Sequence, residues 1–145
     1  MLESTPMSAD DRLDVIDVLA TYPRCLDSGD VEGLAEVFAP DAVLDAMNGS
    51  FSGLTAIFDW ARGLIAGGRV GASPPQLVHF VGLPSVEGDS QRCTAQTYSV
   101  IITYSPEKAI TVPLVGSYHD TLVKKDGKWR IQHRLIKGEL GKTTQ

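Results

Sequence analysis

The chain has 145 residues, a net charge of −5 and 43% hydrophobic residues, and its pI is about 5.0. This length suits one domain with one core, so residues 1–145 are predicted to form a single domain. An acidic chain without a Lys/Arg-rich run repels phosphate backbones, which argues against nucleic acid as a partner. Its two cysteines, Cys25 and Cys93, lie in no CxxC or Cys/His cluster, which argues against a disulfide framework and a structural zinc site.

The hydropathy of the chain predicts a cytoplasmic protein. The first residues, MLESTPMSADDR, are polar and acidic and lack the basic-then-apolar pattern of a secretory signal. No apolar run approaches the roughly 18 residues that cross a bilayer. We therefore expect no membrane partner, and the free thiols fit a reducing compartment.

The first half of the chain is predicted to be mainly helical. Ser8 and Asp11 resemble a capping box, and apolar residues recur at helical spacing as far as Leu26. A second helix is predicted over residues 30–38, with Asp30 as its cap, and a third over residues 54–66.

The second half is predicted to form strands. After a short strand over residues 42–47, segments rich in Val, Ile, Thr and Tyr follow over residues 76–86, 92–104, 110–125 and 128–137. Asp126-Gly127, between the last two, is a strong hairpin signal. Helices followed by a strand meander predict an α+β fold, in which helices cover one face of a curved antiparallel sheet.

Asp27 is the first candidate site residue. At 100° per residue it lies about 20° from Ile16 around the first helix, inside the apolar arc. A carboxylate aimed at a core is costly without a partner, and such groups are candidates for catalysis. Alternatively, Asp27 caps the turn formed by residues 28–30.

His79 is the second candidate, in the middle of a predicted strand. Its side chain shares a face with Leu77 and Val81, as that of an ordinary core histidine would. Beside a buried carboxylate it would instead be held in one tautomer, oriented and made a general base.

Tyr22 and Arg134 complete the candidates. Tyr22 lies at the edge of the apolar arc, where its phenol could donate to an oxyanion or simply reach water. Arg134 could polarise a leaving group or pair with a surface carboxylate, because the face it occupies depends on a possible bulge in the last strand. Five other ionisable residues are interpreted as rim or surface groups: His119, His133, Asp45, Asp59 and Asp120.

Several segments occur together in an order that carries a resemblance. They are Tyr22-Pro-Arg-Cys-Leu-Asp27-Ser-Gly-Asp30, Leu34-Ala-Glu-Val-Phe38, Gly53, Val78-His79-Phe80, Gly116-Ser-Tyr118-His-Asp120 and Gly127-Lys-Trp129-Arg-Ile131 with Arg134. Over residues 8–137 this order resembles the SnoaL-like branch of the NTF2-like superfamily. The resemblance implies a cone in which a curved antiparallel sheet and three N-terminal helices enclose an apolar pocket.

The same resemblance implies an activity. Scytalone dehydratase, bile-acid dehydratase and hexachlorocyclohexane dehydrochlorinase are similar proteins that use an Asp–His pair for elimination without a cofactor. Asp27 and His79 match that pair, and Tyr22 and Arg134 match further site positions. The second acid of the bile-acid enzyme has no counterpart in residues 96–103.

We therefore expect a cofactor-independent and metal-independent lyase or isomerase that acts on a small hydrophobic, polycyclic substrate. His79 would take the proton, Asp27 would orient it, and Tyr22, with Arg134, would stabilise an oxyanion or assist a leaving group. A ligand carrier and the small subunit of a ring-hydroxylating dioxygenase are the alternatives.

We also expect a homo-oligomer, a dimer or a trimer, because a curved sheet leaves a broad outer face to cover. The aromatic residues whose orientation would set the pocket shape are Phe51, Phe58, Trp60, Phe80, Tyr98 and Tyr104.

Overall fold

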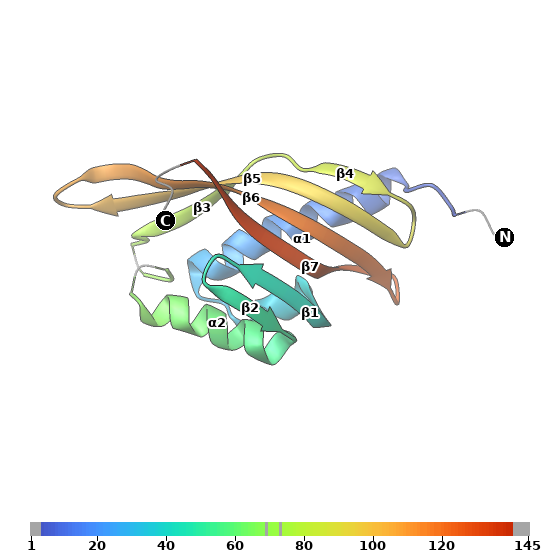
Figure 1. Ribbon diagram of the computed structural model, residues 1–145, viewed down its shortest axis with the longest axis horizontal. Coiled ribbons are helices and arrows are strands. Elements are labelled where there is room, and N and C mark those ends of the chain that lie inside the picture. Colours follow the sequence, from blue (N-terminus) through green and yellow to red (C-terminus); the bar gives the residue numbers. More distant parts are fainter. Residues whose placement is uncertain (1–3, 69, 73, 141–145) are drawn as a thin grey trace.

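The computed structural model describes residues 4–68, 70–72 and 74–140, and it has the predicted α+β architecture (Figure 1). Its helices are α1 (Ala9–Ser28), the short 3₁₀ helix η1 (Glu32–Glu36) and α2 (Leu54–Ala66). Its strands are β1 (Phe38–Ala46), β2 (Gly49–Ser52), β3 (Leu77–Val81), β4 (Ser85–Gly88), β5 (Arg92–Ser105), β6 (Ala109–Lys125) and β7 (Lys128–Leu140).

All seven strands belong to one curved sheet. Their order is β2-β1-β7-β6-β5-β3, and β4 also pairs with β5. The β1–β7 pairing is parallel and the others are antiparallel. Helix α1 packs against β3 and β7 on one face of the sheet, and α2 packs against β1 and β2 (Figure 1).

Helix α1 begins and ends as its sequence predicts. The Ser8 hydroxyl accepts the backbone N–H of Asp11 at 3.0 Å, and the Asp11 carboxylate accepts the backbone N–H of Ser8 at 3.2 Å, which completes the capping box. The helix ends at Gly29, whose φ of 76° is a left-handed conformation that glycine adopts without a steric penalty.

The prediction of three helices is wrong, because residues 4–68, 70–72 and 74–140 form two α-helices. Asp30 accepts the backbone N–H of Gly33 as a cap, but the segment continues only as the five-residue η1. Phe38, expected at the end of a helix, instead begins β1 and pairs with Ile131 of β7. Sheet pairing and complete burial of Phe38 outweigh the helical spacing of this short segment.

The strand predictions locate the sheet but miss two boundaries. The strand expected over residues 76–86 is two strands, β3 and β4, which both pair with β5. Strand β2, which was not predicted, returns along β1 after a turn at residues 47–48. The Asp126-Gly127 hairpin is present, and both residues have positive φ values, 52° and 75°.

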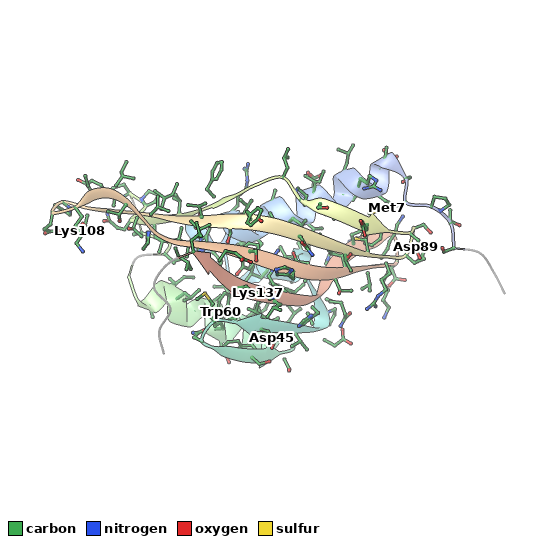
Figure 2. The ribbon with its side chains drawn as sticks, turned by 45° about the horizontal axis from the view of Figure 1, so that its top comes forward. Met7, Asp45, Trp60, Asp89, Lys108 and Lys137 are labelled. Atoms are coloured by element: carbon green, nitrogen blue, oxygen red, sulfur yellow. The ribbon has the colours of Figure 1, made fainter. Side chains whose placement is uncertain are left out.

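The sheet has a buried inner face and an exposed outer face. In β5 the buried residues Cys93, Ala95, Thr97 and Ser99 alternate with exposed ones such as Tyr98. The core lies between the inner face and the helices. Figure 2 shows Trp60 on α2 beneath the sheet and Lys108 at the tip of the β5–β6 hairpin, which projects beyond the helices.

Candidate functional site

An apolar cavity of about 210 Å³ lies between the inner face of the sheet and α2. Two of its lining residues, Met47 and Asn48 in the β1–β2 turn, are exposed. Most of its wall is aliphatic, contributed by Leu64, Val70, Leu77, Ile101, Leu114 and Ile136. Its polar lining residues are few: Tyr22, Asn48, His79, Ser99 and Tyr118.

The structure brings Asp27 and His79 together at this cavity, although 52 residues separate them in sequence. Asp27 Oδ1 lies 2.7 Å from His79 Nδ1, and Asp27 Oδ2 accepts the backbone N–H of His79 at 2.9 Å. The two side chains are 19% and 10% exposed. One carboxylate therefore holds both the ring and the main chain of the same histidine.

Asp27 does not cap the turn that follows it, which was the alternative interpretation of this residue. Asp30 caps the following turn through the backbone N–H of Gly33 at 3.1 Å. Asp27 lies on the last turn of α1, just before the left-handed Gly29, and its carboxylate is directed to β3.

This geometry favours one protonation pattern of the imidazole. A carboxylate beside Nδ1 favours a proton on that nitrogen, and Nε2 then carries a lone pair. Because His79 lines the cavity, that lone pair is available to a bound molecule. The carboxylate also stabilises the imidazolium that forms when Nε2 takes a proton.

Tyr22 also lines the cavity, in edge-to-face contact with Tyr118 of β6. Their ring centroids are 5.6 Å apart and their planes form an angle of 82°. Burial, and next the proximity of Tyr118, raise the pKa of Tyr22 far above its usual value, although the Arg134 guanidinium opposes this. Burial likewise raises the pKa of Tyr118. Both phenols are therefore hydrogen-bond donors near neutral pH.

Arg134 lies behind these phenols and is completely buried. Its Nε and Nη2 atoms donate to the two carboxylate oxygens of Asp120 at 2.7 and 2.8 Å. Burial by itself would lower the pKa of Arg134, but the charge of Asp120, the hydrogen bonds to its carboxylate and the two nearby phenols together outweigh this effect and keep the pKa above its usual value. Arg134 is not among the described residues that line the cavity. Its partner is a carboxylate, as one interpretation predicted, but this carboxylate is buried rather than on the surface.

A bulge in β7 explains why Arg134 faces inward. Thr121 pairs with His133 whereas Leu122 pairs with Ile131, so Gln132 is an extra residue. Strict alternation would place Arg134 opposite Ile131, but the bulge turns both side chains to the buried face.

Asp120 was interpreted as a surface charge, and that interpretation is wrong. It is 3% exposed, on the inner face of β6 between the buried residues Tyr118 and Leu122. Alternation along this strand would have placed it correctly. The same alternation identifies Tyr118 and, on β5, Ser99 as residues of the inner face.

A second carboxylate–imidazole pair lies away from the cavity. His133 Nε2 is 2.7 Å from Asp45 Oδ2, and the two side chains are 42% and 36% exposed. The hydrogen bond with His133, and then that with Ser50, lowers the pKa of Asp45. Both side chains are thus partly exposed, as expected for groups in contact with solvent.

Neither cysteine is a candidate nucleophile. Both are buried free thiols, and burial raises their pKa values, that of Cys93 to about 11. Within residues 4–68, 70–72 and 74–140, no group of three or more His, Cys, Asp or Glu side chains is arranged to hold a metal ion. None of the helices in that part of the chain is both long and apolar enough to span a membrane.

Comparison with known proteins places this chain in a family. A family model described as a SnoaL-like domain matches residues 7–135. The chain belongs to the SnoaL-like family. No curated protein matches the sequence of this SnoaL-like chain.

Solved structures share its NTF2-like, cystatin-like fold. A protein of unknown function from Nostoc punctiforme has a TM-score of 0.80 and 21% identity, covering 93% of this SnoaL-like chain and 96% of its own. Aln2 from a Streptomyces species has a TM-score of 0.76 and 26% identity, covering 92% and 94%. A scytalone dehydratase-like protein from Novosphingobium aromaticivorans has a TM-score of 0.74 and 22% identity, covering 90% and 85%.

The SnoaL-like cavity uses few of the aromatic residues that the sequence offers. Trp60 lines it and donates through Nε1 to Asn48 Oδ1 at 3.2 Å. Phe51 packs against Trp60, with ring centroids 6.1 Å apart. Phe80 and Tyr98 instead lie on the outer face, 63% and 70% exposed.

Proposed function

We propose that this SnoaL-like domain is a cofactor-independent lyase or isomerase that removes a proton from a carbon atom of a small hydrophobic molecule. The observation that carries the proposal is the Asp27–His79 contact on the wall of an apolar cavity. An oriented neutral imidazole with a free Nε2 is the arrangement that a general base needs. The likeness to a scytalone dehydratase-like protein supports the same class of reaction.

In the proposed reaction, Nε2 of His79 takes the proton as the substrate C–H bond breaks. The electron pair moves toward an adjacent carbonyl, whose oxygen accepts a hydrogen bond from Tyr22. In an elimination, the carbonyl re-forms while its electron pair makes the new C=C bond and the leaving group departs from the next carbon, as halide or, with the proton that His79 holds, as water. In an isomerisation, the proton returns to another carbon atom.

The size of the cavity limits the substrate. Its volume of about 210 Å³ is smaller than the roughly 300–1,000 Å³ of pockets for drug-sized ligands. We therefore expect two fused rings rather than a four-ring steroid.

The experiment uses 2-tetralone, a two-ring ketone with acidic C–H bonds, as the probe. NMR in D₂O measures the rate at which its α-protons exchange in the presence of the protein. We expect His79→Ala to reduce the protein-catalysed rate by about 10²- to 10⁴-fold, the usual contribution of a positioned general base.

His119→Ala is the matched control, because His119 lines a separate groove on the outer face of β6. It should leave the exchange rate unchanged. If the wild-type protein and His79→Ala bind 2-tetralone equally and neither accelerates exchange, the enzyme proposal fails and a ligand carrier explains the cavity better.

A further inference from the structure

The polar end of the cavity contains a second phenol for which the proposed mechanism has no role. Tyr118 lines the cavity together with Tyr22 and His79, on a wall that is otherwise mostly aliphatic. Away from the exposed Asn48, a ligand oxygen in the cavity can meet the two phenols, the imidazole of His79 and the hydroxyl of Ser99. Burying that oxygen without a hydrogen bond would be unfavourable, so one or more of these groups must donate to it.

The rings of Tyr22 and Tyr118 are fixed by their neighbours. Tyr22 is in edge-to-face contact with Tyr118 on one side and with Phe38 on the other, at centroid distances of 5.6 and 5.9 Å. The carbon atom of the Arg134 guanidinium lies 4.2 Å from the Tyr22 centroid and 4.0 Å from that of Tyr118. One buried cation therefore packs against both rings.

Asp120 in turn fixes the cation. The paired hydrogen bonds to Nε and Nη2 set the plane of the guanidinium. The remaining nitrogen, Nη1, is buried without a hydrogen-bond partner among the described residues. The Asp120–Arg134 pair is thus held against the two aromatic rings, although an ion pair on the surface would have a smaller desolvation penalty.

Among the charges that the described residues place around the phenols, only that of Arg134 favours a partial negative charge on an oxygen that accepts from them. Burial raises the pKa of Tyr118 most, but Arg134 and the Ser99 hydroxyl act in the opposite direction, while Asp120 and Asp27 add to the effect of burial. The phenol therefore stays protonated at neutral pH, and the nearby guanidinium stabilises charge that develops on an oxygen bound to it.

We propose that Tyr118 is a second hydrogen-bond donor to the substrate oxygen, together with Tyr22, and that the Asp120–Arg134 pair is a positioning pair for both phenols. This inference rests on the proposed function and adds to it a second donor for the carbonyl oxygen of the substrate. Arg134 acts here through the phenols and does not touch the substrate.

The test measures hydrogen bonding to a bound ligand rather than turnover. The probe is 2-tetralone with a ¹³C-labelled carbonyl, and infrared difference spectra record its C=O stretch in the bound state. The stretch should lie at a lower wavenumber in the wild-type protein than in an apolar solvent. Tyr118→Phe should move it to a higher wavenumber and weaken binding about 2- to 10-fold, as expected for one lost hydrogen bond.

Tyr98→Phe is the control, because Tyr98 is on the outer face and 70% exposed. It should change neither the stretch nor the affinity. An unchanged stretch in Tyr118→Phe would overturn the proposal for Tyr118. If His79→Ala still abolished proton exchange in that case, the proposed function would stand without the second donor. If Tyr118→Phe shifts the C=O stretch but the wild-type protein does not catalyse proton exchange, the proposed function is wrong and Tyr118 remains a donor to the bound ligand.

The role of the positioning pair is tested with Asp120→Asn and Arg134→Lys, each with Tyr118 intact and with folding checked by circular dichroism. Both should raise the carbonyl wavenumber by part of the shift seen in Tyr118→Phe. Folded variants that are less stable but keep the wild-type stretch would show that the pair serves stability alone, and would overturn this part of the proposal.

Discussion

At the scale of single residues, the site depends on contacts that join distant segments. The helical position of Asp27 and the strand position of His79 mark both as unusual in the sequence, and the structure places them 2.7 Å apart. The partner of Arg134 was harder to predict. The inward orientation of Arg134 depends on the bulge at Gln132, and no local sequence pattern in β7 reveals that bulge.

Removing Asp120 should be costly, because it would leave the fully buried Arg134 without its counter-charge. We expect Asp120→Ala to lower the free energy of unfolding by about 3–5 kcal/mol, measured by urea denaturation. Adding Arg134→Met to this variant should restore part of the loss, since no unpaired charge then remains. A loss below about 1 kcal/mol for Asp120→Ala would show that the guanidinium is hydrated or paired otherwise.

At the scale of elements, strong local signals predicted α1, α2 and the long strands, and weak ones failed. The capping box of α1 and the Asp126-Gly127 hairpin are local signals, and both are confirmed. The segment over residues 30–38 has helical spacing, but its end pairs with β7, and that pairing is a long-range contact. Such long-range contacts determine the secondary structure of short segments, because intrinsic helix propensity is only a weak preference.

The first turn of α1 is tied to the β6–β7 hairpin by Asp11. Its carboxylate accepts hydrogen bonds from Lys124 Nζ at 2.9 Å and Trp129 Nε1 at 3.0 Å. The hydrogen bond from Lys124, followed by that from Trp129, holds the pKa of Asp11 well below its usual range, against the opposing effect of burial.

This pKa shift predicts an acid-dependent stability. The unfolded chain binds a proton at Asp11 near pH 4, whereas the folded protein does so only at lower pH, so the stabilisation is present above that pH and is lost as the pH falls. Between about pH 5 and pH 2, the free energy of unfolding should fall less steeply in Asp11→Asn than in the wild-type protein. Asp10→Asn, at an exposed neighbouring position, is the control, and equal slopes for Asp11→Asn and wild type would contradict the prediction.

At the scale of the whole molecule, the inner and outer faces of the sheet have different roles. The inner face and the helices enclose the cavity, whereas the outer face exposes large apolar side chains, among them Phe80, Tyr98 and Val112. Sequence alternation predicts both faces, but which side chains close the cavity depends on sheet curvature and on α2. For this reason Trp60 could be named only as one of several aromatic candidates.

We expect the homo-oligomer to form through the outer face of the sheet. Sedimentation velocity should show a dimer or a trimer, because exposed apolar patches of this kind are commonly covered by another chain. Phe80→Glu should shift the protein toward monomer, whereas Lys108→Glu, at the tip of the β5–β6 hairpin, should not. A wild-type protein that stays monomeric at all accessible concentrations would contradict the expectation.

The central claim is that Asp27 holds His79 with Nε2 free to take a proton from a bound molecule. The most direct measurement is a long-range ¹H–¹⁵N NMR spectrum of the histidine side chains, recorded with and without 2-tetralone in the wild-type protein and in Asp27→Asn. We expect His79 to show one tautomer, protonated at Nδ1, with an Nε2 resonance that moves when 2-tetralone binds, and Asp27→Asn to lose this fixed tautomer. A His79 protonated at Nε2, or a mixture of tautomers that does not change in Asp27→Asn, would contradict the account.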